Sequence, residues 1–257
     1  MISLILTIHN QAEIIEKVLS GLVSNISDNA KELIIIFDGC TDSSKDTVCA
    51  WFNGHDCKIP TIFMYADNVF ETKANNMGLK QASQPYVIIT QDDCVIKDYH
   101  FDVKLLEVME KYSDVFAVSG RNAHDIMPNQ YHEVVYVNNT GWGTEFNDPN
   151  TFYVRTVVNR GPLLLKMSVV KELNYLDEAF CPQNGDDHDL CIRASYRGYV
   201  CGCRPINFIS DNDWGGTRKG NGRWIEEAIH KNMRIIYDRH LPTISVLHWD
   251  NFDNRSL

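Results

Sequence analysis

Apolar runs of strand length alternate with amphipathic stretches of helix length through the first third of the chain. The apolar runs are rich in β-branched residues, as strands buried on both faces of a parallel sheet must be. We expect strands over residues 2–8, 33–37, 61–65 and 86–90, and helices over residues 14–23, 43–52 and 73–82. This alternation is typical of βαβ units. The sequence therefore predicts an α/β fold with a mostly parallel central sheet flanked by helices.

Polar clusters follow three of these expected strands directly, at residues 7–10, 38–42 and 91–93. In parallel sheets, ligands bind beyond the carboxyl ends of the strands, so we expect the clusters to converge on one rim. Asn10, with Glu13 three residues later, is also expected to cap the helix that follows.

The second half of the chain is less regular. We expect helices over residues 101–112, 168–173, 189–196 and 224–239, and a strand over residues 115–118. Residues 121–160 are polar and aromatic, with scattered glycines, and are expected to form long loops around a site.

The charge balance argues against a nucleic-acid partner, because 24 basic residues face 34 acidic ones for a formal charge of −10. A nucleotide remains possible, since a metal ion, a few cations or backbone N–H groups can hold a diphosphate. No apolar stretch approaches the ~20 residues that a transmembrane segment needs. The eight cysteines are scattered without repeated CxxC pairs, so we expect free thiols in a cytoplasmic protein.

Gln91-Asp92-Asp93 is the strongest local feature. Adjacent carboxylates repel each other unless a cation lies near them, and Mg²⁺ or Mn²⁺ suits carboxylate oxygens. A solvated turn explains the same residues equally well. Both interpretations therefore stay open at this point.

Asp38 and Asp42 flank the turn after another expected strand. We expect Asp38 to contact the base or ribose of a nucleotide and Asp42 to cap the next helix, although a tight turn would also explain both.

A third acidic cluster lies at residues 186–189. One of its carboxylates could act as a general base, while helix capping and a calcium loop are alternatives. His188 is a candidate metal ligand or simply a hydrogen-bonding residue.

Arg218, in a glycine-flanked loop at residues 214–219, is a candidate contact for a leaving diphosphate. Residues 248–250 form either a further metal or acceptor contact or a packing segment.

Taken in order, these segments resemble the inverting family 2 glycosyltransferases of the GT-A fold, from residue 2 to about residue 199. The matching motifs are Thr7-Ile8-His9-Asn10, Asp38-Gly39-Cys40-Thr41-Asp42, Ala74-Asn75-Asn76-Met77-Gly78-Leu79, Gln91-Asp92-Asp93, and Asp177-Glu178 with Asp186-Asp187-His188-Asp189-Leu190. Gln91 replaces the usual first carboxylate of the aspartate signature, and Asp186 replaces the usual Glu. The resemblance implies a single GT-A domain with a Rossmann-like sheet. It would comprise a donor-binding half at residues 1–115, an acceptor-binding and catalytic half at residues 116–210, and a C-terminal helical segment and tail at residues 211–257.

The resemblance also implies residue roles. Asp93 would bind Mn²⁺ or Mg²⁺, and Asp187 would be the catalytic base for direct displacement at the anomeric carbon. Lys73 is expected to add a phosphate contact. The expected donor-binding residues are Thr7, His9, Asn10, Asp38, Lys73, Asn76, Gln91, Asp92 and Arg218. The donor would be a UDP-, GDP- or dTDP-linked sugar and the acceptor a glycan, a lipid-linked molecule or a protein. The enzyme would be cytoplasmic, either free or peripheral at the membrane that carries the acceptor.

Three other functions compete with this interpretation. A sugar-nucleotide nucleotidyltransferase would carry a glycine-rich basic loop after its first strand, whereas residues 7–11 here read Thr-Ile-His-Asn-Gln. A phosphatase of the haloacid dehalogenase type would need Asp-x-Asp directly after a strand, whereas Asp38 and Asp42 are four positions apart and Asp92 and Asp93 are adjacent. A non-catalytic nucleotide-sugar or glycan-binding module remains an alternative, and activity measurements separate it from an enzyme.

Overall fold

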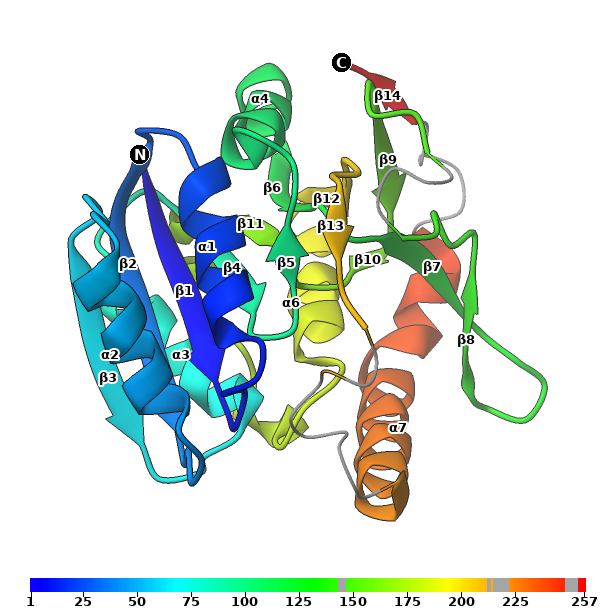
Figure 1. The fold of residues 1–257 in the computed structure, drawn as a ribbon. Coiled ribbons are helices and arrows are strands. Elements are labelled where there is room, and N and C mark those ends of the chain that lie inside the picture. The colour runs from blue at the N-terminus through cyan, green and yellow to red at the C-terminus, as the bar shows by residue number, and fades with distance from the viewer. Residues whose placement is uncertain (143–146, 212–213, 215–221, 248–253) are drawn as a thin grey trace.

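The computed structural model describes residues 1–142, 147–211, 214, 222–247 and 254–257, with the last five residues of the long C-terminal helix described by their backbone alone. Within these residues, a nine-stranded sheet forms the centre of the molecule (Figure 1), in the order β14-β9-β12-β6-β11-β4-β1-β2-β3. Its strands are β1 (Ile2–Ile8), β2 (Ala30–Asp38), β3 (Thr61–Ala66), β4 (Tyr86–Gln91), β6 (Val115–Ser119), β9 (Thr151–Arg155), β11 (Leu163–Lys166), β12 (Val200–Cys203) and β14 (Arg255–Ser256).

The first four strands of this sheet in the chain are parallel. β1 pairs in parallel with both β2 and β4, and β2 pairs in parallel with β3. β11 runs antiparallel between β4 and β6, and β12 is parallel to β6. The predicted α/β fold with a mostly parallel sheet is therefore confirmed. Because this sheet is continuous across residue 115, the division of the chain into functional halves stays a prediction.

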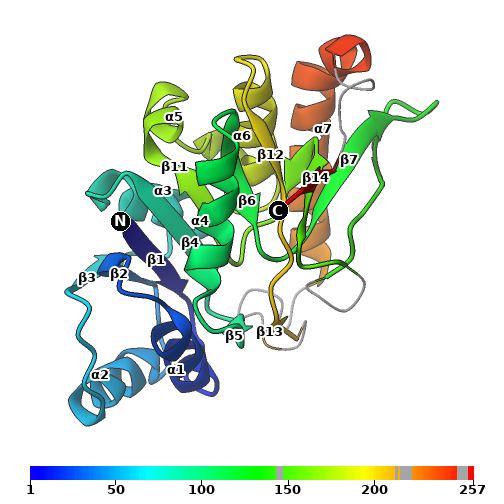
Figure 2. The same ribbon diagram turned by 90° about the horizontal axis from the view of Figure 1, so that it is seen from above.

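Alternate residues of the central strands face two helical layers. Leu4 and Leu6 of β1 pack with α1 (Ile15–Asn25), α2 (Ser44–Gly54) and α4 (Phe101–Lys111). Ile5 of β1 packs with the other layer, which contains α3 (Glu71–Gln81), α5 (Met167–Glu172), α6 (Asp186–Ser195) and α7 (Gly222–Leu247). Figure 2 shows α1 and α2 on the opposite side of the sheet from α5, α6 and α7. This two-sided burial explains why β1 and β2 read as continuous apolar runs rather than as alternating ones.

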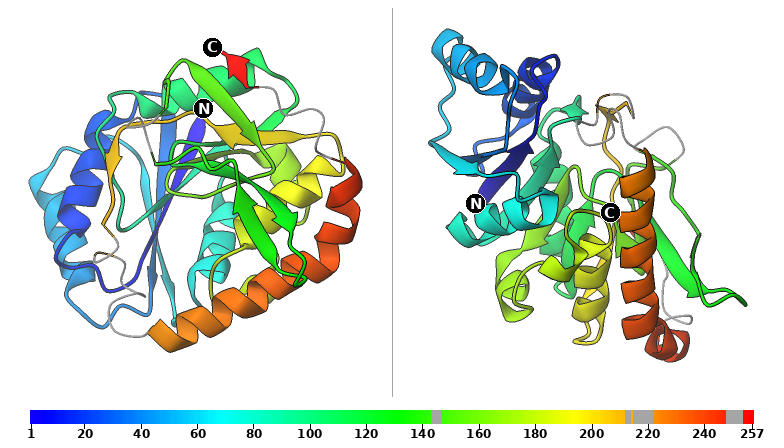
Figure 3. Two further views of the ribbon diagram at one scale, coloured as in Figure 1. Left: turned by 90° about the vertical axis from the view of Figure 1, so that its right-hand side faces the viewer. Right: turned by 90° about the horizontal axis from the view of Figure 1, so that it is seen from below.

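The expectation of long loops over residues 121–160 is wrong. This region contains β7 (Ala123–Pro128), β8 (Val134–Val137), β9 and β10 (Val157–Val158). β7, β8 and β10 form a small antiparallel sheet beside α7 (Figure 3). A second small sheet pairs β5 (Val95–Ile96) with β13 (Phe208–Ile209). These strands are short and are defined by their partners, so their periodicity alone does not reveal them.

The eight cysteines all lie in the described part of the chain and all are free thiols, as predicted. Across the described residues, none of the helices has both the length and the apolar character needed to cross a membrane.

Candidate active site

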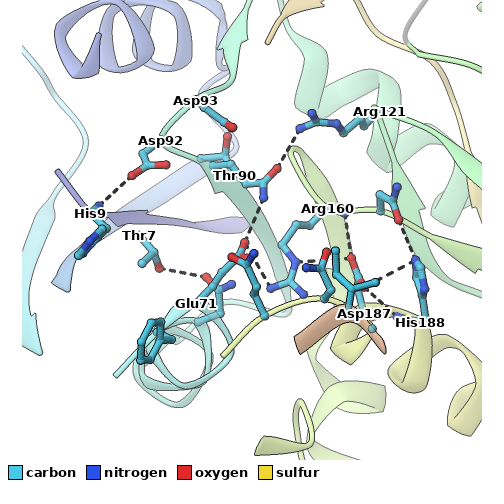
Figure 4. A pocket seen from close by; sticks show the side chains of 18 of the residues that line it. Thr7, His9, Glu71, Thr90, Asp92, Asp93, Arg121, Arg160, Asp187 and His188 are labelled. Carbon is cyan, nitrogen blue, oxygen red and sulfur yellow. Dashed lines mark hydrogen bonds and ion pairs between the residues drawn. The ribbon is translucent and has the colours of Figure 1, made fainter. Parts of the chain in front are cut away.

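A pocket of about 340 Å³ opens at the carboxyl ends of β1, β2 and β4. Its other walls come from α3, from the loop after β10, from the start of α6 and from α7. In Figure 4, Asp92 and Asp93 lie toward one end of the pocket and Asp187 and His188 toward the other, with Glu71 and Arg160 between them. Asp38 lines the pocket as well, so each of the three acidic clusters that the sequence singles out contributes a carboxylate to it.

The three polar clusters that follow β1, β2 and β4 do converge. The backbone N–H of His9 donates to Asp92 Oδ2 at 2.8 Å, and His9 Nδ1 lies 2.6 Å from the carbonyl oxygen of Asp38. Thr7 Oγ1 donates to Asn75 Oδ1 at 3.0 Å, which ties the end of β1 to α3. These contacts confirm the common rim predicted from the parallel topology.

Asp38 shapes the wall on the β2 side. Its two carboxylate oxygens accept hydrogen bonds from the backbone N–H groups of Val69 (2.7 Å) and Phe70 (2.8 Å). Phe70 has a positive φ of 68°, so this carboxylate stabilises an unfavourable backbone conformation just before α3. Asp38 lines the pocket while it also holds this loop.

Asp92 and Asp93 form the acidic end of the pocket. Burial raises the pKa of Asp92 well above its ordinary value, and the carboxylates of Asp93 and Glu71 add to the rise, although the His9 N–H opposes it. A divalent cation would relieve this crowding of negative charge. Among the described residues, no three His, Cys, Asp or Glu side chains are grouped closely enough to hold a metal ion. A metal here would therefore take two protein carboxylates at most from this group and complete its shell with other oxygens, an arrangement common for Mg²⁺.

Gln91 connects two charged side chains across the floor of the pocket. Its Nε2 donates to Glu71 Oε1 at 3.0 Å, and its Oε1 accepts from Arg121 Nη1 at 2.9 Å. An amide can donate through its nitrogen and accept through its oxygen at the same time, whereas a carboxylate in its place would face Glu71 as a second negative charge. This explains why a glutamine is compatible with the position where the family usually has a carboxylate.

Arg121 packs against two aromatic rings. Its guanidinium carbon is 4.3 Å from the centre of the Trp142 ring and 5.6 Å from that of Phe208, and the two rings stack on each other with 29° between their planes. Trp142 is 42% exposed and lines the pocket. The contact with the guanidinium helps to hold this aromatic surface at the pocket.

Asp187 lies in the first turn of α6 and faces the pocket. Its Oδ1 accepts from the backbone N–H of His188 at 2.9 Å, and its Oδ2 lies 3.5 Å from Nε of Arg160. Arg160 also forms ion pairs with Asp186, through Nη2, and with Glu71, at 3.7 Å. Burial alone would lower the pKa of Arg160, but the effect of these carboxylates is larger. The net result is a pKa above the ordinary value of arginine, so the guanidinium stays charged.

Two buried histidines lie behind Asp187. Burial lowers the pKa of both His124 and His188 to about 3, so both rings are neutral at physiological pH. His188 Nε2 lies 2.7 Å from Asn159 Oδ1, which fixes Nε2 as the protonated nitrogen. Nδ1 is then an acceptor that faces the hydroxyl of Tyr136 at 3.5 Å. His188 is therefore a hydrogen-bonding residue of the pocket wall.

The remaining acids of α6 have structural partners. Asp189 Oδ2 accepts one hydrogen bond from Arg193 Nε at 2.6 Å, and Asp189 Oδ1 lies 2.8 Å from Nε2 of His240 of α7. Asn232 of α7 donates to the backbone carbonyls of Phe180 and Gln183. These contacts fix α7 against the loop before α6, so Ile229 and Met233 of α7 reach the pocket.

Three of the expected donor-binding residues do not line the pocket. Asn10 has a positive φ of 52°, and its Oδ1 accepts from the backbone N–H groups of Thr41 and Asp42, so it holds the neighbouring turn. It does not cap α1, whose N-cap residue is Ile14. Lys73 is exposed on α3 outside the pocket.

The third of these residues, Asn76, is buried against the loop after α5, where it bonds to the backbone of Leu176. Its neighbour Asn75 lines the pocket instead, because successive residues of a helix point in different directions. Arg218 and residues 248–250 lie outside the described residues.

Several pocket residues escaped the sequence analysis, namely Glu71, Arg121, Tyr136, Trp142 and Arg160. The only local signal for the last four was the mixture of arginines and aromatic side chains in the polar region after β6.

Comparison with known proteins agrees with this geometry. Residues 3–173 match the family described as Glycosyl transferase family 2. The chain is 31% identical over 246 residues to poly-beta-1,6-N-acetyl-D-glucosamine synthase of Staphylococcus aureus, an alignment that covers 92% of this chain and 56% of the relative. The chain spans between 28% and 56% of the length of the synthases of this name that it matches.

Solved structures share the fold. The mannosyltransferase PcManGT from Pyrobaculum calidifontis, in complex with GDP-Man and Mn²⁺, superposes with a TM-score of 0.59 at 15% identity, over 79% of this chain and 54% of that chain. TarS of S. aureus in complex with UDP superposes with a TM-score of 0.54 at 16% identity, over 82% of this chain and 58% of that one. The architecture is thus that of the GT-A-type glycosyltransferases. With its sequence match extending over residues 3–173, the chain belongs to glycosyl transferase family 2.

Proposed function

We propose that this chain transfers a sugar from a nucleotide-diphospho-sugar to a hydroxyl group of a glycan acceptor, with inversion at the anomeric carbon. The observation that carries the proposal is that one pocket contains both an acidic pair at the end of β4 and a separate carboxylate, Asp187, at the start of α6. The first group suits a metal-bound diphosphate and the second suits an acceptor hydroxyl.

The donor would lie along the ends of β1 and β2. Thr7, His9 and Asp38 line this part of the pocket and offer a hydroxyl, an imidazole and a carboxylate to a nucleoside. The structural neighbours bind GDP-Man, UDP and UDP-GlcNAc, which supports a nucleoside-diphosphate sugar without selecting its base.

Asp93, together with Asp92, would hold Mn²⁺ or Mg²⁺. Their carboxylate oxygens are the ligands that hard cations prefer, and the negative charge gathered there favours a cation. When bound, such an ion supplies charge neutralisation for the departing nucleoside diphosphate. Two structural neighbours contain Mn²⁺, which supports the choice of metal.

Asp187 would take the proton of the acceptor hydroxyl as that oxygen attacks the anomeric carbon. Tyr136 and Asn159, which both contact His188, line the same part of the pocket and combine aromatic surface with a hydrogen-bonding amide. Such a surface suits a sugar ring, which has apolar faces and a polar edge. The similarity to polysaccharide synthases supports a glycan acceptor over a lipid or protein one.

Two measurements test the proposal. A panel of UDP-, GDP- and dTDP-linked sugars should contain at least one that raises the melting temperature in the presence of Mn²⁺, because a ligand at about 100 times its Kd stabilises the folded state by about 2.7 kcal/mol. The same donor should then release its nucleoside diphosphate when a set of oligosaccharide acceptors is added. Stabilisation without any acceptor-dependent release would instead indicate a non-catalytic sugar-nucleotide-binding module, and the absence of both effects would overturn the proposal.

A further inference from the structure

Arg160 is a buried cation that touches the proposed base from the loop after β10. Its side chain is 5% exposed and lies among three carboxylates, those of Asp186, Asp187 and Glu71. Its backbone N–H also donates to Asp187 Oδ2, at 3.3 Å. Asp187 is thus contacted by both the main chain and the side chain of the same residue.

Without a nearby cation, keeping the Asp187 carboxylate ionised in this environment would cost free energy. Asp186 is fully buried and Asp187 is 7% exposed, and the two are adjacent in the first turn of α6. Burial and a neighbouring negative charge both favour the protonated form of a carboxyl group, which cannot accept a proton from an acceptor hydroxyl. A working base at this position therefore needs a compensating positive charge.

The other groups packed around Asp187 do not supply that charge. On α6 itself, His188 lies 3.8 Å away but is neutral, because burial and Arg160 lower its pKa to about 3. From β7, His124 is also neutral, since burial lowers its pKa to about 3. Tyr136 of β8 is neutral as well, because burial raises its pKa, and Glu71 of α3 is itself acidic. From α7, the side chains at the pocket are the apolar Ile229 and Met233. Within the described residues that face Asp187 from these elements, the positive charge comes from Arg160.

We propose that Arg160 is a positioning residue for the base, which compensates the burial of the Asp187 carboxylate and holds it toward the pocket. The inference rests on the proposed function of Asp187. The ion pair with Asp186 fixes the guanidinium so that its Nε faces Asp187. Arg160 also contacts Glu71, which accepts a hydrogen bond from Gln91 on the donor side of the pocket. Gln91 in turn accepts one from Arg121.

The first test compares Arg160→Met with wild type over a range of pH. We expect kcat near neutral pH to fall by roughly tenfold or more, with a smaller change in the KM for the donor. The acid limb of the pH–rate profile should move to higher pH by about one to three units, because an opposite charge within 4–6 Å has been removed. Arg160→Lys, which keeps the charge but not the planar contacts, should restore the position of the limb more than the maximal rate.

A matched control is Arg204→Met. Arg204 is another buried arginine with a carboxylate partner, Glu107 at 2.6 Å, but it lies outside the pocket. This variant should leave the position of the acid limb unchanged.

The double variant Arg160→Met/Asp186→Asn separates the two partners of Arg160. If the arginine served only to neutralise Asp186, the double variant would regain the wild-type profile, and the proposal would be wrong.

A readout independent of activity completes the test. In protein labelled with ¹³C at the aspartate carboxyl groups, the resonance of Asp187 is the one lost in Asp187→Asn, and its titration can be followed by NMR in wild type and in Arg160→Met. We expect Asp187 to titrate at higher pH in the variant. An unchanged titration, with or without a loss of rate, would overturn the inference. If wild type shows no transfer at all, the proposed function fails, while the NMR titration still decides whether Arg160 keeps Asp187 ionised.

Discussion

Replacing Gly161 by alanine should destabilise the protein, because the new side chain would displace Gln91 at the floor of the pocket. Gly161 has a positive φ of 93°, a conformation that side chains disfavour. A Cβ atom there would lie 2.5 Å from Gln91 Oε1 and 3.2 Å from Arg121 Nη1. Since the first distance is far below van der Waals contact, the Gln91 amide would have to move.

The expected loss has two parts. The backbone conformation costs about 1–2 kcal/mol for a residue with a side chain. Moving the amide disrupts its hydrogen bonds to Glu71 and Arg121. Hydrogen bonds to charged groups contribute about 1.5–3 kcal/mol. With the loss of one such hydrogen bond, the free energy of unfolding should therefore fall by about 2.5–5 kcal/mol.

Gly198→Ala is the matched control. Gly198 has a similar φ of 82°, but nothing lies within 4 Å of the position of its Cβ atom. Urea denaturation should show a loss of about 1–2 kcal/mol for this variant, so the difference between the two variants reports the Gln91 network alone. Equal losses in the two variants would refute the idea that Gln91 is held against Gly161.

Three further predictions concern single acidic residues. Asp187→Asn should bind donor as wild type does yet transfer sugar at least ~100-fold more slowly in single-turnover assays, and retained turnover would exclude it as the base. Asp93→Ala should remove the Mn²⁺-dependent part of donor stabilisation in thermal melts with and without EDTA, and an unchanged metal effect would place the ion elsewhere. Burial tends to raise the pKa of Glu32, but hydrogen bonds from Ser3 and Ser83 outweigh it and lower the pKa below its ordinary value of 4.5. Glu32 thus contributes stability above that pH that is lost on acidification. Glu32→Gln should be less stable than wild type by about 1–2 kcal/mol at pH 7, and this difference should shrink below pH 4.5. Urea denaturation at a series of pH values measures it. A difference that stays constant with pH would show that the pKa of Glu32 is not lowered by folding.

The regular elements of the first half were predictable because local sequence decides them. The expected strand at residues 2–8 coincides with β1, and the expected helix at residues 73–82 lies within two residues of α3. These segments bury a continuous run or one helical face, so their periodicity reports their structure directly. The strand β11 was missed because it is short and pairs with β4, a distant segment of the chain. The strands β7 and β8 were missed because they lie in a polar region where we expected loops, although they pair with each other as a hairpin.

The sequence by itself determined which chemistry gathers at the rim of the sheet. Parallel strands that end in polar residues must present them on the same side, so the meeting of Thr7, Asp38 and Asp92 in one pocket followed from the order of the elements. The order of the motifs likewise identified the family. Neither conclusion required knowledge of side-chain packing.

Only the tertiary structure decided how each group is used. The phase of α3 turns Asn75 toward the pocket and Asn76 toward the backbone of Leu176, a difference of one residue that a motif does not resolve. Arg160 meets Asp187 because β10 and α6 pack together, although the two residues are 27 positions apart. The charge state of a buried carboxylate depends on such neighbours, and these are set by the folded chain rather than by the residues beside it in the sequence.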